Sequence, residues 1–104
     1  MMEKYFEAII KWISREDGGR KRLPRQGTRY CPIIRINEGE KFLDWSIDLI
    51  CPDFSQSSKI EFKFLVDGAP IGLVELETQY ELYEGKRKVA EIIVKKERQR
   101  ENLN

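Results

Sequence analysis

The stretch FLDWSIDLIC, residues 42–51, alternates between apolar and polar side chains over most of its length. Successive side chains of a β-strand point to opposite faces, so this alternation predicts a strand with one buried face. The apolar face would carry Leu43, Trp45, Ile47, Leu49 and Cys51, and the polar face Asp44, Ser46 and Asp48. The stretch therefore indicates a fold that contains β-sheet.

Three later stretches repeat the pattern and extend the prediction to several strands. In KIEFKFLV, residues 59–66, the inward set is Ile60, Phe62, Phe64 and Val66. In LVELETQYEL, residues 73–82, it is Val74, Leu76, Thr78, Tyr80 and Leu82. In KVAEIIV, residues 88–94, Ala90, Ile92 and Val94 fall on one side of the strand and Val89 and Ile93 on the other.

Turn-forming residues separate these runs. They are Asn37-Glu38-Gly39, Pro52-Asp53, Ser55 to Ser58, Asp67-Gly68 and Glu84-Gly85. Short strands at this spacing are typical of an antiparallel sheet closed into a barrel or a sandwich. The residues alone therefore predict an all-β domain.

Residues 4–13, KYFEAIIKWI, fit two structures. Phe6, Ala8, Ile10 and Trp12 alternate as in a strand, whereas Tyr5, Ile9 and Ile13 fit a helical stripe. A helix here would end naturally at Gly18, since glycine adopts the left-handed conformation at little cost. Periodicity leaves strand and helix open for this segment.

The length and composition predict one globular domain with a charged surface. The chain has 104 residues, of which 40% are hydrophobic and 36% are charged. We expect a single domain over residues 1–95. Residues 96–104 are almost wholly polar and predict a charged tail, solvated or forming a frayed helix.

The start of the chain carries charges among its apolar residues, which does not fit a signal peptide. No segment approaches the roughly 20 apolar residues of a membrane span. We therefore expect a cytoplasmic protein with no membrane partner. Cys31 and Cys51 are then expected to be free thiols on strands.

Enzymatic activity is disfavoured because the usual catalytic groups are missing from the sequence. There is no histidine to act as a general base, and two cysteines without histidine are a poor zinc site. No nucleophile elbow or cofactor-binding loop occurs. We expect no catalytic residue, no metal and no cofactor, and we interpret the acidic strand faces as aids to solubility or as a docking surface.

Positive charge is concentrated in the stretch SREDGGRKRLPRQGTRYCP, residues 14–32. Residues 15–29 carry six positive and two negative charges, whereas residues 30–94 carry seven positive and twelve negative. The basic residues are Arg15, Arg20, Lys21, Arg22, Arg25 and Arg29. They could bind phosphate groups through guanidinium contacts and counterion release, or they could simply pair with the acidic body of the domain.

Two smaller features have structural interpretations. Gly18 and Gly19 predict a tight turn that needs positive φ. Trp12 and Trp45 lie on predicted strand faces, where tryptophan is more often part of a core than a platform for a ligand.

Part of the sequence resembles the third domain of elongation factor Tu. FEAIIKWISREDGGRKRLPRQGTRYCPIIRI, residues 6–36, is similar to the strand, acidic-Gly-Gly-Arg turn and proline-bearing loop that open that domain. APIGL, residues 69–73, resembles its His-Pro-Ile-Ala-Met stretch. ELYEGKRKVAEIIV, residues 81–94, resembles its final hairpin, and together the three anchors fall within residues 4–95.

The resemblance implies a six-stranded antiparallel β-barrel in which residues 4–13 form a strand. It also implies a role in holding the T-stem of aminoacyl-tRNA, carried by Arg20, Glu84 and Gly85. Two departures matter. The chain has no Gly-x-x-x-x-Gly-Lys-Ser/Thr loop, so no nucleotide is expected, and GTRYCP contains residues inserted relative to the family's Gly-Tyr-Arg-Pro.

Two functional hypotheses remain open at this point. The first is a module that binds structured RNA, such as a tRNA-like stem, through Arg20, Lys21, Arg22, Arg25, Arg29, Glu84 and Gly85. The second is a protein-interaction domain that docks a translation factor, or neutralises a partner protein, through its barrel surface. Both describe a binding protein and not an enzyme.

Overall fold

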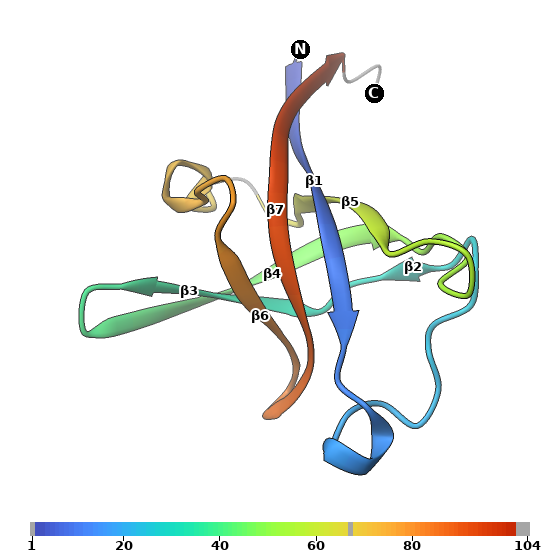
Figure 1. Ribbon diagram of the computed structural model, residues 1–104. Coiled ribbons are helices and arrows are strands. Elements are labelled where there is room, and N and C mark those ends of the chain that lie inside the picture. Colours follow the sequence, from blue (N-terminus) through green and yellow to red (C-terminus); the bar gives the residue numbers. More distant parts are fainter. Residues whose placement is uncertain (1, 67, 102–104) are drawn as a thin grey trace.

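A computed structural model describes residues 2–66 and 68–101, and within them the protein is all-β (Figure 1). The strands are β1 Met2–Trp12, β2 Arg29–Tyr30, β3 Ile33–Glu38, β4 Lys41–Ile50, β5 Lys59–Phe64, β6 Gln79–Glu84 and β7 Arg87–Glu101. Two short 3-10 turns, η1 Arg15–Asp17 and η2 Ile71–Leu73, are the only helical segments of the described ranges.

Six strands close into an antiparallel barrel. Hydrogen-bonded neighbours follow one another in the order β4, β3, β6, β7, β1 and β5, and β5 pairs in turn with β4. Every pairing is antiparallel. The predicted fold class, an all-β six-stranded antiparallel barrel, is therefore confirmed.

The seventh strand, β2, lies outside the barrel and continues the line of β3 along β4. Tyr30 is opposite Leu49 and Ile33 is opposite Ser46, so β2 and β3 share one register. Between them Pro32 has no N–H to donate, although its carbonyl accepts a hydrogen bond of 3.0 Å from the Ile47 amide. Proline thus interrupts a single long strand and leaves its first two residues beyond the barrel wall.

The first segment is a strand, as the resemblance implied. Phe6, Ala8 and Ile10 are buried and Trp12 is partly buried, which is the period-two pattern, and β1 pairs with both β5 and β7. The helical interpretation fails because pairing on two edges buries this alternating face.

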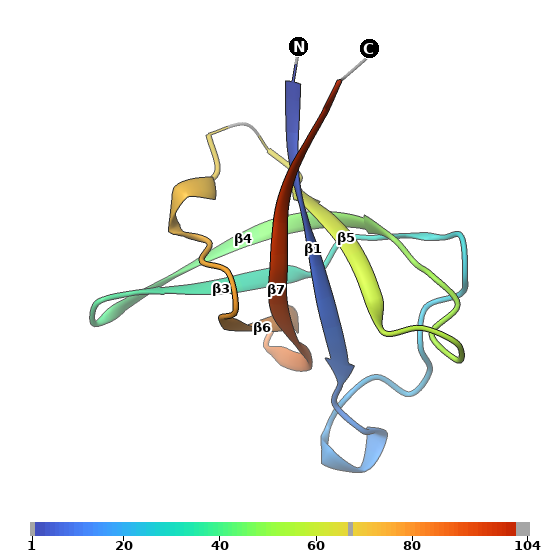
Figure 2. The same ribbon diagram turned by 45° about the horizontal axis from the view of Figure 1, so that its top comes forward.

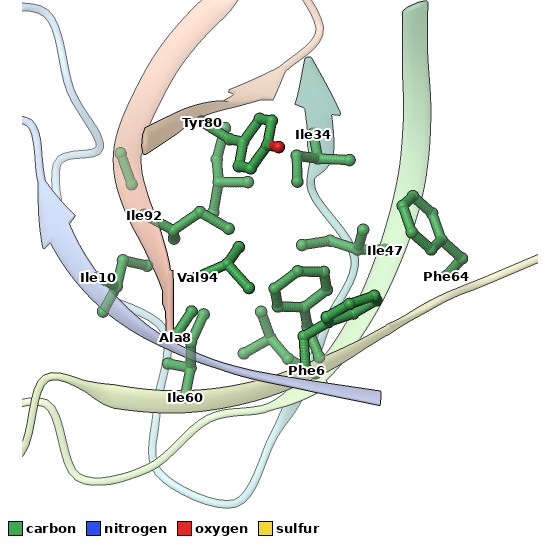
Figure 3. Close-up of a cluster of buried hydrophobic side chains, with 14 of the residues drawn as sticks. Phe6, Ala8, Ile10, Ile34, Ile47, Ile60, Phe64, Tyr80, Ile92 and Val94 are labelled. Carbon is green, nitrogen blue, oxygen red and sulfur yellow. The ribbon is translucent and has the colours of Figure 1, made fainter. Parts of the chain in front are cut away.

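The barrel interior is filled by alternate residues of all six strands (Figure 3). The ring centroids of Phe6 and Phe62 lie 5.3 Å apart in a stacked arrangement, and Phe64 meets both rings edge-on. Trp12 and Trp45 pack against this core, in agreement with their interpretation as core residues.

Two residues expected to point inward are exposed. Val66 lies beyond the end of β5, and Leu76 precedes β6, which begins only at Gln79. The interruption before β6 is at Glu77, whose φ of 60° is incompatible with extended backbone. The run from 73 to 82 is therefore part loop and part strand.

Val89 and Ala90 are both buried, although alternation placed them on opposite faces of the strand. The register between β6 and β7 shifts between Leu82 and Tyr83, where Leu82 is opposite Ala90 and Tyr83 is opposite Lys88. Val89 is the extra residue of this β-bulge, which lets two consecutive side chains, Val89 and Ala90, enter the core.

The described residues after 95 are exposed, as a solvated tail would be, but they belong to strand β7 and do not form a frayed helix. Strand β7 continues to Glu101 and pairs with the first residues of β1 (Figure 1). Ion pairs join the two strands: Lys4 with Glu97, Glu7 with Arg98, and Glu3 with Arg100. Charged residues therefore build a strand here without contributing to the core.

No helix in the described part of the chain has the length and apolar character needed to cross a membrane.

Candidate nucleic-acid interface

The two segments singled out by the sequence lie at the same end of the molecule. Figures 1 and 2 both show the turn that follows β1 close to the tip of the β6–β7 hairpin. The fold brings together residues 64 positions apart, since Arg20 contacts Glu84. This end of the barrel is the candidate interface.

The turn after β1 is fixed by its own hydrogen bonds. Ser14 accepts a bond from the Asp17 amide, and its carbonyl accepts one of 2.9 Å from the Gly19 amide. Gly18 has a φ of 94°, as predicted for a tight turn. Gly19 is required for a different reason, because a Cβ at this position would lie 2.0 Å from the Ile13 carbonyl oxygen.

The β6–β7 hairpin has a two-residue loop, with Glu84 opposite Arg87. Gly85 occupies the first loop position with a φ of 61°, as in the turn types that match the twist of two-stranded ribbons. Gly85 therefore serves the geometry of the turn and places Glu84 and Arg87 side by side across the strands.

Glu84 is the centre of a partly buried cluster. One of its carboxylate oxygens, Oε2, accepts hydrogen bonds from the Arg20 guanidinium and from the Tyr30 hydroxyl. Arg20 also donates from Nε to the Arg22 carbonyl at 2.8 Å. Its guanidinium carbon lies 5.3 Å from the centroid of the Tyr30 ring. Burial, followed by the bond to Glu84, raises the pKa of Tyr30 above its ordinary range, so the hydroxyl stays protonated.

Aromatic residues underlie this cluster. Trp12 packs against Tyr30 at 5.8 Å and against Phe54 at 5.1 Å between ring centroids. The indole Nε1 of Trp12 is buried without a hydrogen-bond partner. Because these rings contact one another, they are engaged in packing and do not form an exposed platform for bases.

A shallow surface hollow lies over the cluster, lined by Arg20, Lys21, Arg22, Glu84 and Arg87. Within the described residues, Lys21, Arg22 and Arg87 have no carboxylate within 4.0 Å. Glu84, the only acid of the lining, is already occupied by Arg20 and Tyr30. The hollow therefore presents three free cations to solvent.

The structure divides the predicted site residues into groups. Arg20, Lys21, Arg22 and Glu84 come together, with Gly85 in the adjoining turn. Arg25 is exposed and its carbonyl accepts a 2.6 Å bond from the Thr28 hydroxyl, outside the lining of the hollow.

Arg29 lies elsewhere, on β2. Its guanidinium makes two hydrogen bonds, of 2.9 and 3.2 Å, to the Asp48 carboxylate. Arg29 therefore lies on the face formed by β4 and β5. Its contact with Asp48 fits the alternative interpretation, in which a basic residue pairs with the acidic body of the domain and does not bind phosphate.

Sequence reasoning missed Arg87 as a member of this site. The signal available was its position three residues after Glu84, across a two-residue hairpin loop, which places the two side chains on neighbouring strands.

A scan against protein-family models finds no family that matches the chain, and a search of curated proteins finds no match either. In the described ranges no three histidine, cysteine, aspartate or glutamate side chains come together as a metal site would require.

Proposed function

We propose that this protein is a non-enzymatic cytoplasmic binding module that holds structured RNA at the end of the barrel formed by the turn after β1 and the β6–β7 hairpin. The proposal includes a relationship to the third domain of elongation factor Tu, as a free-standing barrel. It rests on the resemblance of residues 6–36 and 81–94 and on the geometry at this end of the molecule.

One observation carries the proposal. Lys21, Arg22 and Arg87 line a common hollow and have no carboxylate partner among the described residues. Cations without an internal partner keep their charge available for phosphate oxygens and for counterion release. Arg20 differs from them, because Glu84 and Tyr30 hold it in place.

The acidic strand faces give less support to the alternative, a domain that docks a basic partner through its carboxylates. Asp44 pairs with Arg35, Asp48 with Arg29, Glu77 with Lys95, and Glu81 with Lys88. Carboxylates that already have a cation partner within the chain offer little net charge to another protein.

Recognition of a helical stem fits this site better than recognition of a single strand. Proteins that bind single strands stack bases on exposed aromatic rings. Here the Trp12 ring packs against both Tyr30 and Phe54 at this end of the barrel. A duplex is held mainly through its phosphates and sugar hydroxyls, which Lys21, Arg22 and Arg87 can contact.

The test is a titration of the protein into a labelled RNA hairpin and, separately, into a labelled single strand of the same length. Contacts with about three phosphates predict a log-log slope of affinity against salt of roughly −2 to −3. Lys21→Ala, Arg22→Ala and Arg87→Ala should each lower the magnitude of this slope by about 1.

Lys59→Ala is the matched control, because Lys59 is an exposed lysine on β5 and does not line the hollow at this end of the barrel. It should leave affinity and slope unchanged. Binding that ignores salt, absence of binding, or an equal loss with Lys59→Ala would remove the proposal.

A further inference from the structure

A second concave region lies on the outer face of the barrel, away from the candidate RNA site. It has a volume of about 690 Å³, within the range of ligand-binding clefts. Outward side chains of five strands line it, and we name it the β4–β5 groove. The lining includes Glu7, Arg29, Asp48, Ile50, Pro52, Lys59, Glu61, Lys63 and Arg100.

The groove lies where two ribbons cross. The paired ends of β1 and β7 extend beyond the barrel in one direction, and β4 with β2 extends in another (Figure 1). Strand β5 lies in the corner and pairs with both β1 and β4. The outer surface is therefore hollowed here, although a closed barrel is otherwise convex.

Ion pairs around the groove are layered, with the carboxylate below and the cation above. The side chain of Asp48 is 15% exposed and that of its partner Arg29 is 59% exposed. Glu3 is 20% exposed beneath Lys63 at 37% and Arg100 at 51%. Above their paired carboxylates, Arg29, Lys63 and Arg100 face an incoming molecule, together with the exposed Lys59 and the exposed carboxylate of Glu61. Cations therefore outnumber carboxylates at the exposed level of the groove.

The groove also offers an apolar contact. Ile50 is 61% exposed, more than any other large hydrophobic residue that the structure describes, and Pro52 lies beside it in the lining. A phosphate backbone would gain nothing from Ile50. An acidic protein segment with an aromatic or aliphatic side chain would use both features.

Such a segment is present in the same chain, at the tip of the β3–β4 hairpin. We name residues 37–42 the β3–β4 arm. Strand β6 pairs with β3 only as far as Arg35, and β5 pairs with β4 only from Ile47, so the arm projects beyond its neighbours (Figures 1 and 2).

The arm has the complementary chemistry. Glu38 and Glu40 are exposed and, in the described part of the chain, have no cation within 4.0 Å. Phe42 is 54% exposed, with the Arg35 guanidinium 4.0 Å from the centroid of its ring. The arm therefore carries two free carboxylates next to an exposed aromatic ring whose orientation is fixed.

The arm cannot reach the groove of its own molecule. Figures 1 and 2 show it on the opposite side of the barrel from β2 and β5, in a molecule whose longest extent is 42 Å. We propose that the β3–β4 arm of one copy docks in the β4–β5 groove of a second copy, with Phe42 against Ile50 and Glu38 and Glu40 among the cations. The contact is heterologous, so copies associate head to tail.

The test uses sedimentation velocity of the full chain over a concentration series reaching about 1 mM, since a contact this small is expected to be weak. The arm variant is Glu38→Lys with Glu40→Lys, and the groove variant is Ile50→Thr with Lys59→Glu. All four positions are exposed, and threonine keeps the β-branched side chain that suits a strand.

The sedimentation coefficient of the wild-type protein should increase as its concentration rises. Each variant alone should lose this dependence, because its association constant should be at least tenfold lower than that of the wild type. A mixture of the two variants should form dimers and nothing larger, because each pair retains one intact arm and one intact groove. Lys11→Glu, outside both surfaces, should behave as wild type.

Three results would overturn the inference. The first is wild-type protein that stays monomeric throughout the series. The second is association that survives in both variants, or a mixture that fails to restore it. The third is a groove variant that weakens RNA binding while the wild type is monomeric, which would assign the groove to nucleic acid.

Discussion

The hydroxyl of Tyr30 donates a hydrogen bond to the carboxylate of Glu84, a residue 54 positions later in the chain. This contact joins the strand outside the barrel to the β6–β7 hairpin. Arg20 donates to the same carboxylate oxygen. The basic loop between β1 and β2 is therefore anchored to the barrel at Arg20 and at Tyr30. Its basic side chains extend from a backbone whose position is fixed by these two contacts.

Tyr30→Phe removes one donor to Glu84 while keeping the ring against Trp12. We expect a loss of about 1 kcal/mol in the free energy of unfolding, because Glu84 keeps Arg20 as a partner. Urea denaturation followed by tryptophan fluorescence measures it. A change smaller than the error of the measurement would show that the hydroxyl is equally well satisfied by water.

The same variant should alter the dependence of stability on pH. Burial and Glu84 raise the pKa of Tyr30 above the unfolded value of 10.0. The folded state therefore holds the tyrosine proton more tightly than the unfolded state does. The contribution of the protonated hydroxyl to stability is complete below the unfolded pKa of 10.0 and is lost as pH rises above it. Between about pH 10 and pH 11 the wild type should lose stability more steeply than Tyr30→Phe, in parallel thermal melts.

The two adjacent glycines should respond differently to alanine. Gly18→Ala forces a side chain into a φ of 94° and should cost about 1–2 kcal/mol. Gly19→Ala places a Cβ 2.0 Å from the Ile13 carbonyl oxygen, so the backbone itself must move. We expect a loss of more than about 3 kcal/mol in chemical denaturation. Equal losses at the two positions would contradict this account.

Arg35 should not be replaceable by lysine. Its guanidinium lies 4.0 Å from the Phe42 ring centroid and 4.3 Å from that of Tyr83, and it makes two bonds of 2.9 and 3.0 Å to Asp44. A lysine keeps the charge but loses the planar, two-pronged contact. Arg35→Lys should lower the melting temperature by a few degrees, whereas Lys41→Arg, on the exposed arm, should leave it unchanged.

The loss in Arg35→Lys should shrink at low pH. The hydrogen bonds from Arg35 hold the pKa of Asp44 below its ordinary value. Because the pKa of Asp44 is lower in the folded state, its carboxylate stabilises the fold at pH values above 3.8, its unfolded pKa. This stabilisation is lost as pH falls. Melting temperatures of wild type and variant should therefore converge from pH 5 toward about pH 2. A constant difference would mean that the aromatic contacts, and not Asp44, account for the loss.

The sequence predicted those parts of the fold that depend on burial, since alternation in β4 and β5 records which side chains face the core. For β1 the alternation left strand and helix open, and only the resemblance favoured a strand. It did not predict the bulge at Val89, because one inserted residue leaves the local pattern ambiguous. It also missed the end of β7, where pairing with β1 is supported by ion pairs such as Glu3 with Arg100, and charged residues carry no period-two signal.

The candidate site was predictable to a similar extent. The resemblance identified Arg20 and Glu84, which the structure brings into contact. Composition alone grouped Arg29 with them, but the partner that separates it, Asp48, is 19 residues away and is revealed only by strand pairing. Arg87 was missed because the predicted hairpin did not fix the strand register, which places Arg87 opposite Glu84 across a two-residue loop.

The final prediction separates two roles for Arg20 in RNA binding. Arg20→Ala should weaken binding of the RNA hairpin, but the proposed reason is indirect. Without Arg20, the Glu84 carboxylate loses its cation partner. It lies in the same hollow as Lys21, Arg22 and Arg87, so its negative charge would repel a phosphate group that binds there. Glu84→Gln in the Arg20→Ala background should then restore most of the lost affinity, because the amide carries no charge. If Arg20 itself contacts phosphate, the double variant stays as weak as Arg20→Ala. Affinities of the two variants at one low salt concentration distinguish these cases, with circular dichroism as the check that both remain folded.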